Sequence, residues 1–109
     1  MAIKANLQID QGADFSTDID VTDDNNEAVN LAGYSGAAQM RKHYTSSTST
    51  AFTVAINASG GTVTLSMNAT TSANVAPGRY VYDCELTSSS NVVSRLVEGI
   101  VTVTPQVTR

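Results

Sequence analysis

The side chains that could carry chemistry are few, and they do not form a catalytic pattern. His43 is the only histidine and Cys84 is the only cysteine. A serine-histidine-aspartate triad would have to use His43, and the chain has no Gly-x-Ser-x-Gly nucleophile elbow. One cysteine and one histidine also fall short of the three or four ligands that zinc takes. The sequence therefore predicts a protein that is not an enzyme, with no catalytic residue, no metal and no cofactor.

Several aspartates gather in one part of the chain, namely Asp14, Asp18, Asp20, Asp23 and Asp24. Calcium takes several oxygen ligands from a well-ordered loop, and this spacing does not match an EF-hand loop. A solvated acidic face that protects a sheet edge from unwanted pairing fits the pattern better. A calcium site stays the alternative for these residues.

Four tyrosines could offer rings for stacking against sugars: Tyr34, Tyr44, Tyr80 and Tyr82. The strict alternation of Pro77–Leu86 predicts a strand that turns Tyr80, Tyr82 and Cys84 toward a core. We therefore expect Tyr80 and Tyr82 in core packing and in a tyrosine corner, where a phenol binds the backbone just upstream. Tyr44, at the edge of a polar loop, is left as the aromatic candidate for contact with a ligand.

Period-two alternation recurs along the chain and predicts the elements that must position these residues. A single helical turn is expected at Thr70–Val75, and a β-bulge near Glu98–Gly99 would explain a change of phase in the last strand. An odd number of short strands favours two packed sheets over a closed barrel. The fold predicted for residues 1–109 is one all-β domain, an immunoglobulin-like β-sandwich of about seven antiparallel strands. The expected strands are Ile3–Ile9, Phe15–Val21, Gly36–Tyr44, Phe52–Ile56, Val63–Met67, Tyr80–Leu86 and Val92–Val103.

Length and charge exclude several classes of protein. The chain has 109 residues, enough for one hydrophobic core. Its formal net charge of −4 argues against a protein that binds duplex nucleic acid, because such binding needs a basic face. The N-terminus lacks the apolar stretch of a signal peptide, and no apolar run is long enough to span a membrane. With one cysteine there is no intrachain disulfide, which suits folding in a reducing cytoplasm.

Six short segments carry a family resemblance, in order and over nearly the whole chain: Gln11–Phe15, Leu31–Tyr34, Ala38–Lys42, Gly61–Leu65, Pro77–Asp83 and Glu98–Pro105. In these segments the chain resembles small virion structural proteins of tailed bacteriophages, of the myophage and cyanophage type. It is also similar to the N-terminal domain of phage baseplate upper proteins. The resemblance implies an immunoglobulin-like virion protein that is made in the host bacterial cytoplasm. It would be a head decoration, neck, tail or baseplate component that binds other virion proteins in many copies.

The two ends of the predicted sandwich suggest how such a protein would attach. Ile3–Ile9 and Val101–Val107 have apolar alternation without a cluster of charge, so we expect them to be edges that pair with a neighbouring subunit. The alternative is an adhesion module that binds a host-surface glycan through Thr45–Thr50 and Tyr44. The expected protein-contact residues are Ile3, Ala5, Leu7, Val103, Gln106 and Val107.

Overall fold

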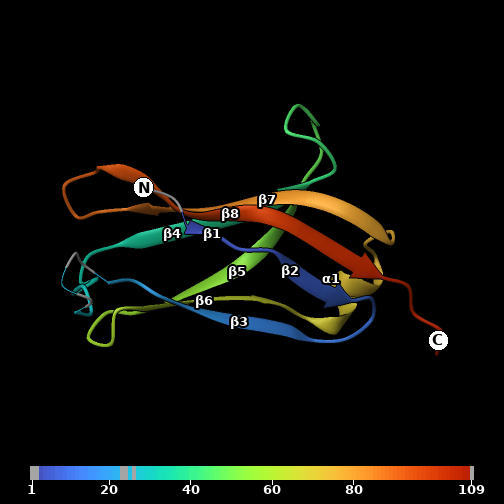
Figure 1. Ribbon diagram of the computed structural model, residues 1–109, viewed down its shortest axis with the longest axis horizontal. Coiled ribbons are helices and arrows are strands. Elements are labelled where there is room, and N and C mark those ends of the chain that lie inside the picture. Colours follow the sequence, from blue (N-terminus) through green and yellow to red (C-terminus); the bar gives the residue numbers. More distant parts are fainter. Residues whose placement is uncertain (1–2, 23–24, 26, 109) are drawn as a thin grey trace.

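Alternation of apolar and polar side chains builds an all-β molecule with one helical turn near one end (Figure 1). The computed structural model describes residues 3–22, 25 and 27–108. Helix α1 spans Ala69–Ala73, close to the predicted turn, and its N-cap Asn68 accepts a hydrogen bond from the Thr71 backbone N–H. Within the described ranges the strands are β1 Ile3–Lys4, β2 Leu7–Asp10, β3 Phe15–Asp20, β4 Ser35–Arg41, β5 Thr50–Asn57, β6 Thr62–Met67, β7 Gly78–Thr87 and β8 Val93–Thr104.

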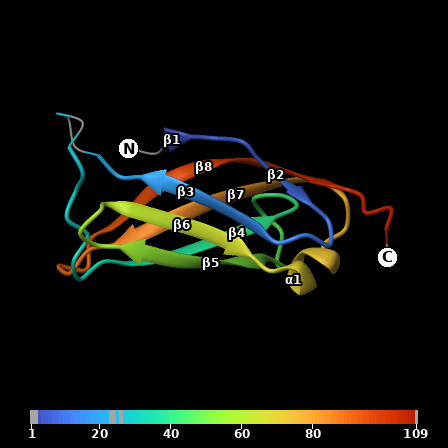
Figure 2. The ribbon, with the colours of Figure 1, turned by 90° about the horizontal axis from the view of Figure 1, so that it is seen from below.

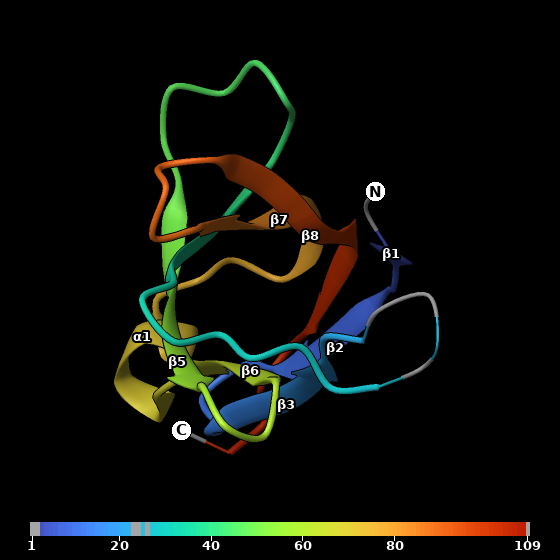
Figure 3. The ribbon, with the colours of Figure 1, turned by 90° about the vertical axis from the view of Figure 1, so that its left-hand side faces the viewer.

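The strands form one curled sheet in the order β1-β8-β7-β4-β5-β6-β3, with β2 following β1 along the same side of β8. Strand β5 makes the curl, because residues 50–52 pair with β4 and residues 53–57 pair with β6. The half that contains β8, β7 and β4 therefore faces the half that contains β6 and β3 (Figures 2 and 3). The all-β class is confirmed, and the predicted hairpin of β5 and β6 is present.

The core lies between the two halves and contains the residues that the alternation turned inward. From β7 it takes Tyr82, Cys84 and Leu86, and Tyr80 packs against it half-buried. Opposite them, the inward side chains of β6 are all buried. Strand β4 presents small residues here, and a Cβ atom on Gly36 would lie only 2.8 Å from a Val54 methyl group. The close approach of the two halves explains why position 36 must be a glycine, whereas Met40 fills the core further along the same strand.

The two ends of the chain pair with each other, which corrects the predicted topology. Strands β1 and β2 both run parallel to β8, while β7 pairs antiparallel with the other side of β8. The expectation that all strands are antiparallel is therefore wrong, and Val101–Thr104 is an interior segment rather than a sheet edge. The physical reason is burial: Val97, Val101 and Val103 all lie in the core, and β1 and β2 cover the side of β8 that would otherwise be open.

The predicted continuous strand Ile3–Ile9 is interrupted at Ala5 and Asn6. The Ala5 carbonyl accepts a 2.6 Å hydrogen bond from the Tyr82 hydroxyl, and the Asn6 side-chain oxygen accepts one of 3.1 Å from the Ile100 N–H. A Cβ atom on Gly99 would overlap the Ala5 carbonyl oxygen. Glycine at position 99 is thus required by the approach of the N-terminal segment.

A β-bulge does occur in the last strand pair, but not where the glycine indicated. The register shifts between Cys84 and Glu85, which lie opposite Val97 and Arg95, so Leu96 is the extra residue. Both Leu96 and Val97 are buried, which accounts for the change of phase in the sequence. The predicted position at Glu98–Gly99 is therefore wrong. Gly99 allows the close approach of the Ala5 backbone and does not mark the bulge.

We expect Gly99→Ala to lower the free energy of unfolding by about 2 kcal/mol or more, because the added methyl group meets backbone rather than a side chain that can move. Gly60→Ala is the matched control, since its added methyl group meets only the Asn57 side chain. That variant should change stability by less than about 0.5 kcal/mol. Urea unfolding of the three proteins measures the difference, and equal losses in both variants would contradict the role given to Gly99.

Two neighbouring ionisable groups of β7 are held in the neutral form. Burial, with a smaller contribution from Asp83 and Glu85, raises the pKa of the Cys84 thiol from 9.0 to about 11. Burial also raises the pKa of the Tyr82 phenol from 10.0 to about 12, with a smaller contribution from Cys84. Cys84 is a free thiol in the core, which makes it unreactive near neutral pH.

These shifts predict that the protein loses stability in alkali. Above pH 9 the unfolded chain releases the Cys84 proton while the folded protein keeps it, so stability falls as the pH rises toward 11. Denaturant midpoints measured at pH 8, 9, 10 and 11 should therefore decline, and Cys84→Ala should decline less steeply over the same interval. An identical pH dependence in the variant and the parent protein would show that the thiol is not the cause.

Candidate functional site

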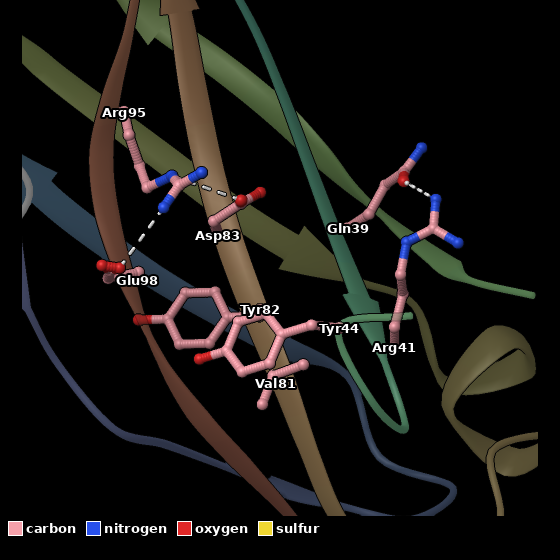
Figure 4. Close-up of a pocket in the computed structure, with 8 residues that line it drawn as sticks. All are labelled: Gln39, Arg41, Tyr44, Val81, Tyr82, Asp83, Arg95 and Glu98. Atoms are coloured by element: carbon pink, nitrogen blue, oxygen red, sulfur yellow. Dashed lines mark hydrogen bonds and ion pairs between the residues drawn. The ribbon is translucent and has the colours of Figure 1, made fainter. Parts of the chain in front are cut away.

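A shallow groove of about 240 Å³ lies on the outer face of β4, β7 and β8 (Figure 4). Strand register sets its floor, because Gln39 lies opposite Asp83 and Asp83 lies opposite Glu98. These three side chains form one polar row across three strands. The next row brings Arg41 opposite Val81. The groove is therefore a product of pairing between segments that are distant in the sequence.

Arg95 links the two carboxylates of the groove. Its Nε lies 3.4 Å from Asp83 Oδ2, and its Nη1 lies 3.5 Å from Glu98 Oε2. Both separations exceed the spacing of about 2.7–2.9 Å that strong charge-assisted hydrogen bonds adopt. The side chains of Arg95 and Asp83 are also 49% and 40% exposed. These groups consequently keep donor and acceptor capacity for a further molecule.

The polar loop between β4 and β5 projects from the sheet beside the groove (Figures 1 and 3). Arg41 ties it down, because Nη1 donates 2.7 Å to the Ser46 carbonyl while Nη2 donates 3.1 Å to Gln39 Oε1. The His43 N–H donates to Ser46 Oγ, and the Ser46 N–H donates to the His43 carbonyl, each at 3.0 Å. Tyr44 lies in this tight turn, is 82% exposed and lines the groove.

The expected protein-contact residues do not share one surface. Ile3 is half-exposed on β1, and Val107 is 91% exposed beyond β8, toward the other end of the molecule (Figure 1). Ala5 and Leu7 pack half-buried against the core, and Val103 is fully enclosed on β8, so its side chain is not accessible as the prediction assumed. The Gln106 N–H donates 3.0 Å to the side-chain oxygen of Gln11, which fastens the C-terminal segment to the β2–β3 turn.

The acidic residues of β3 already have partners. Asp18 and Asp20 accept hydrogen bonds from the hydroxyls of Thr64 and Thr62, at 2.7 and 3.3 Å. Asp14 accepts the Ala69 N–H at 2.7 Å, at the start of α1. Among the described residues no group of three or more histidine, cysteine, aspartate or glutamate side chains could hold a metal. Two members of the predicted cluster, Asp23 and Asp24, lie outside the described residues.

The other candidate side chains have structural surroundings. The Tyr80 hydroxyl donates 2.6 Å to the Ala76 carbonyl, which confirms the tyrosine corner. Tyr34 packs half-buried against the core, and His43 is exposed. In the described part of the chain, no helix is long and apolar enough to cross a membrane.

Sequence reasoning found Tyr44 but missed the polar side chains beside it. The polar side chains of β4, β7 and β8 come together in the groove only because these strands pair in a particular register. The available signal was the outward phase of β7, which places Val81 and Asp83 on one face. That phase does not reveal which residues of other strands stand beside them.

No family model matches the chain, and no curated protein is similar to it. Among solved structures, an internalin-like protein of Listeria monocytogenes is similar, with a TM-score of 0.53 and 14% identity. The match covers 94% of this chain and 28% of that chain, so this chain spans little more than a quarter of its length. At this identity the likeness shows the fold alone.

The hydrogen bonds of Arg41 predict that the loop between β4 and β5 is ordered, and hydrogen exchange can measure this. Arg41→Ala should raise the hydrogen-exchange rate of the Ser46 amide by about tenfold or more, because the turn loses its tie to the sheet. Global stability should change by less than about 1 kcal/mol, since the side chain is not in the core. Lys42→Ala is the control, because that ammonium group lies over the Tyr80 ring, 5.0 Å from its centroid. Equal exchange rates in both variants would refute the anchor.

Proposed function

We propose that the protein is a non-enzymatic structural or accessory component of a tailed-phage virion, present in many copies and bound to other virion proteins. The resemblance of six ordered segments supports this proposal. The observation that carries it further is the open N-terminal edge of the sheet. Strands β1 and β2 end the strand order on one side, and Ile3 exposes half of its surface there.

The two edges of the sheet differ in their suitability for strand addition. Strand β3 ends the other side, and its outward Asp18 and Asp20 are exposed carboxylates that discourage pairing. The charged side chains of the β1–β2 edge are Lys4 and Asp10, which have opposite signs, so this edge lacks the row of like charges that β3 presents. A strand from a neighbouring subunit would therefore extend the sheet beyond β1 and β2.

Deleting the N-terminal segment would be a poor test of this proposal, because β2 pairs with β8 and its loss would uncover buried Val101 and Val103. Point substitutions at exposed positions avoid that problem. Ile3→Lys and Val107→Asp change residues that expose apolar surface on the β1–β2 edge and in the segment that follows β8. Val92→Asp is the matched control, since Val92 is 63% exposed but lies in the β7–β8 hairpin.

We expect Ile3→Lys or Val107→Asp to weaken binding to particles about tenfold, and Val92→Asp to have little effect. The measurement is occupancy on assembling or stripped particles, quantified by mass spectrometry, with circular dichroism as the folding control. Absence of the parent protein from purified virions would reject the proposed function. Full occupancy by both variants would reject attachment through the β1–β2 edge and the segment that follows β8.

A second candidate function is a module that binds a host-surface glycan. The groove beside Tyr44 favours it, because an exposed aromatic ring stands next to polar side chains on a sheet face. The two functions are compatible, since a particle component can present its outer face while its edges are occupied.

A further inference from the structure

We propose that the groove on β4, β7 and β8 binds one neutral pyranose ring, held by two neighbouring hydroxyl groups at Arg95 and Asp83 and by its C–H face at Tyr44 and Val81. This inference rests on the second candidate function and names its ligand class and site. It does not depend on incorporation into a particle.

The charges of the groove favour a neutral ligand. Its four charged side chains are Arg41, Arg95, Asp83 and Glu98, and their formal charges cancel. A guanidinium group only donates hydrogen bonds, and a carboxylate only accepts them. Arg95 and Asp83 therefore place a donor beside an acceptor. Each sugar hydroxyl both donates and accepts, so two adjacent hydroxyls match this pair where a simple anion or cation would match only half of it.

The apolar part of the groove fits the other side of a sugar ring. Val81 lies in the floor, and Tyr44 stands above the sheet on its loop (Figure 4). Tyrosine provides a flat apolar face with a polar tip, which suits a ring whose C–H face is apolar and whose edge is polar. The hydrogen bonds of Arg41 hold the loop before any ligand binds, so less ordering is required on binding.

The size of the groove limits the ligand and its affinity. Its volume of about 240 Å³ is below the ~300–1,000 Å³ of pockets that enclose drug-sized ligands. One ring fits, and much of it stays in contact with water. We therefore expect a dissociation constant of roughly 1–10 mM for the isolated protein. Display in many copies would raise the effective affinity for a repeating polysaccharide.

The test is a nitrogen-15 NMR titration of the isolated protein with methyl β-D-glucopyranoside up to about 100 mM, well above the expected dissociation constant. Cyclohexanol at the same concentrations is the matched probe, because it has the apolar ring without neighbouring hydroxyls. We expect saturable shifts at the amides of Tyr44, Asp83, Arg95 and Glu98 with the sugar. Cyclohexanol should give much smaller shifts.

Variants separate the groove from the rest of the surface. Tyr44→Ala and Asp83→Asn should each weaken sugar binding about tenfold or more. His43→Ala changes the adjoining loop residue, and Asp18→Asn changes a carboxylate on β3; both should bind like the parent protein. Absence of saturable shifts, shifts outside the groove, or equal responses to both probes would overturn the proposal. The particle occupancy of the parent protein is a separate readout, so the virion role and the sugar site fail independently.

Discussion

The structure depends on the pairing of the two ends of the chain along β8. This pairing puts a strand on each side of β8 and lets three valines of that strand enter the core. It also requires a glycine at position 99, because the Ala5 carbonyl passes directly over it. The same strand carries Glu98 and Arg95 to the outer face, so the geometry of the groove rests on an interior strand rather than on an edge.

The strands and their inward faces could be predicted from the sequence because the side-chain period of a strand is a local property. The neighbours of each strand could not be predicted, because alternation shows which side chains are buried but not which strand pairs with which. Asn6 and Ile100 meet across 94 positions, and nothing in either segment specifies the other. Gly99 misled the bulge prediction because glycine serves both bulges and close backbone approaches, and only the fold distinguishes them.

The candidate site was likewise predictable only in part: single residues could be identified within their own segments, but not the residues of other strands that lie beside them. Tyr44 was predictable because an aromatic residue in a polar loop stands out within its own segment. Asp83 and Arg41 were predictable only as outward residues of their strands. Their convergence with Arg95 follows from register and from the extra residue at Leu96, which places Arg95 opposite Glu85 and beside Asp83. A single-residue change of register would disperse the groove while leaving the alternation of each strand unchanged.

The parallel alignment of β1 and β2 with β8 has a mechanical consequence. The chain enters beside the middle of β8 and leaves past its far end, along a molecule whose longest dimension is 44 Å (Figure 1). Tension between the two ends would pull β2 and β8 in opposite directions along their length. The hydrogen bonds between Leu7–Asp10 and Val101–Thr104 would then be loaded together in shear, instead of opening one after another as in a peeled hairpin. This geometry resists extension, a useful property wherever forces act on both ends of the chain.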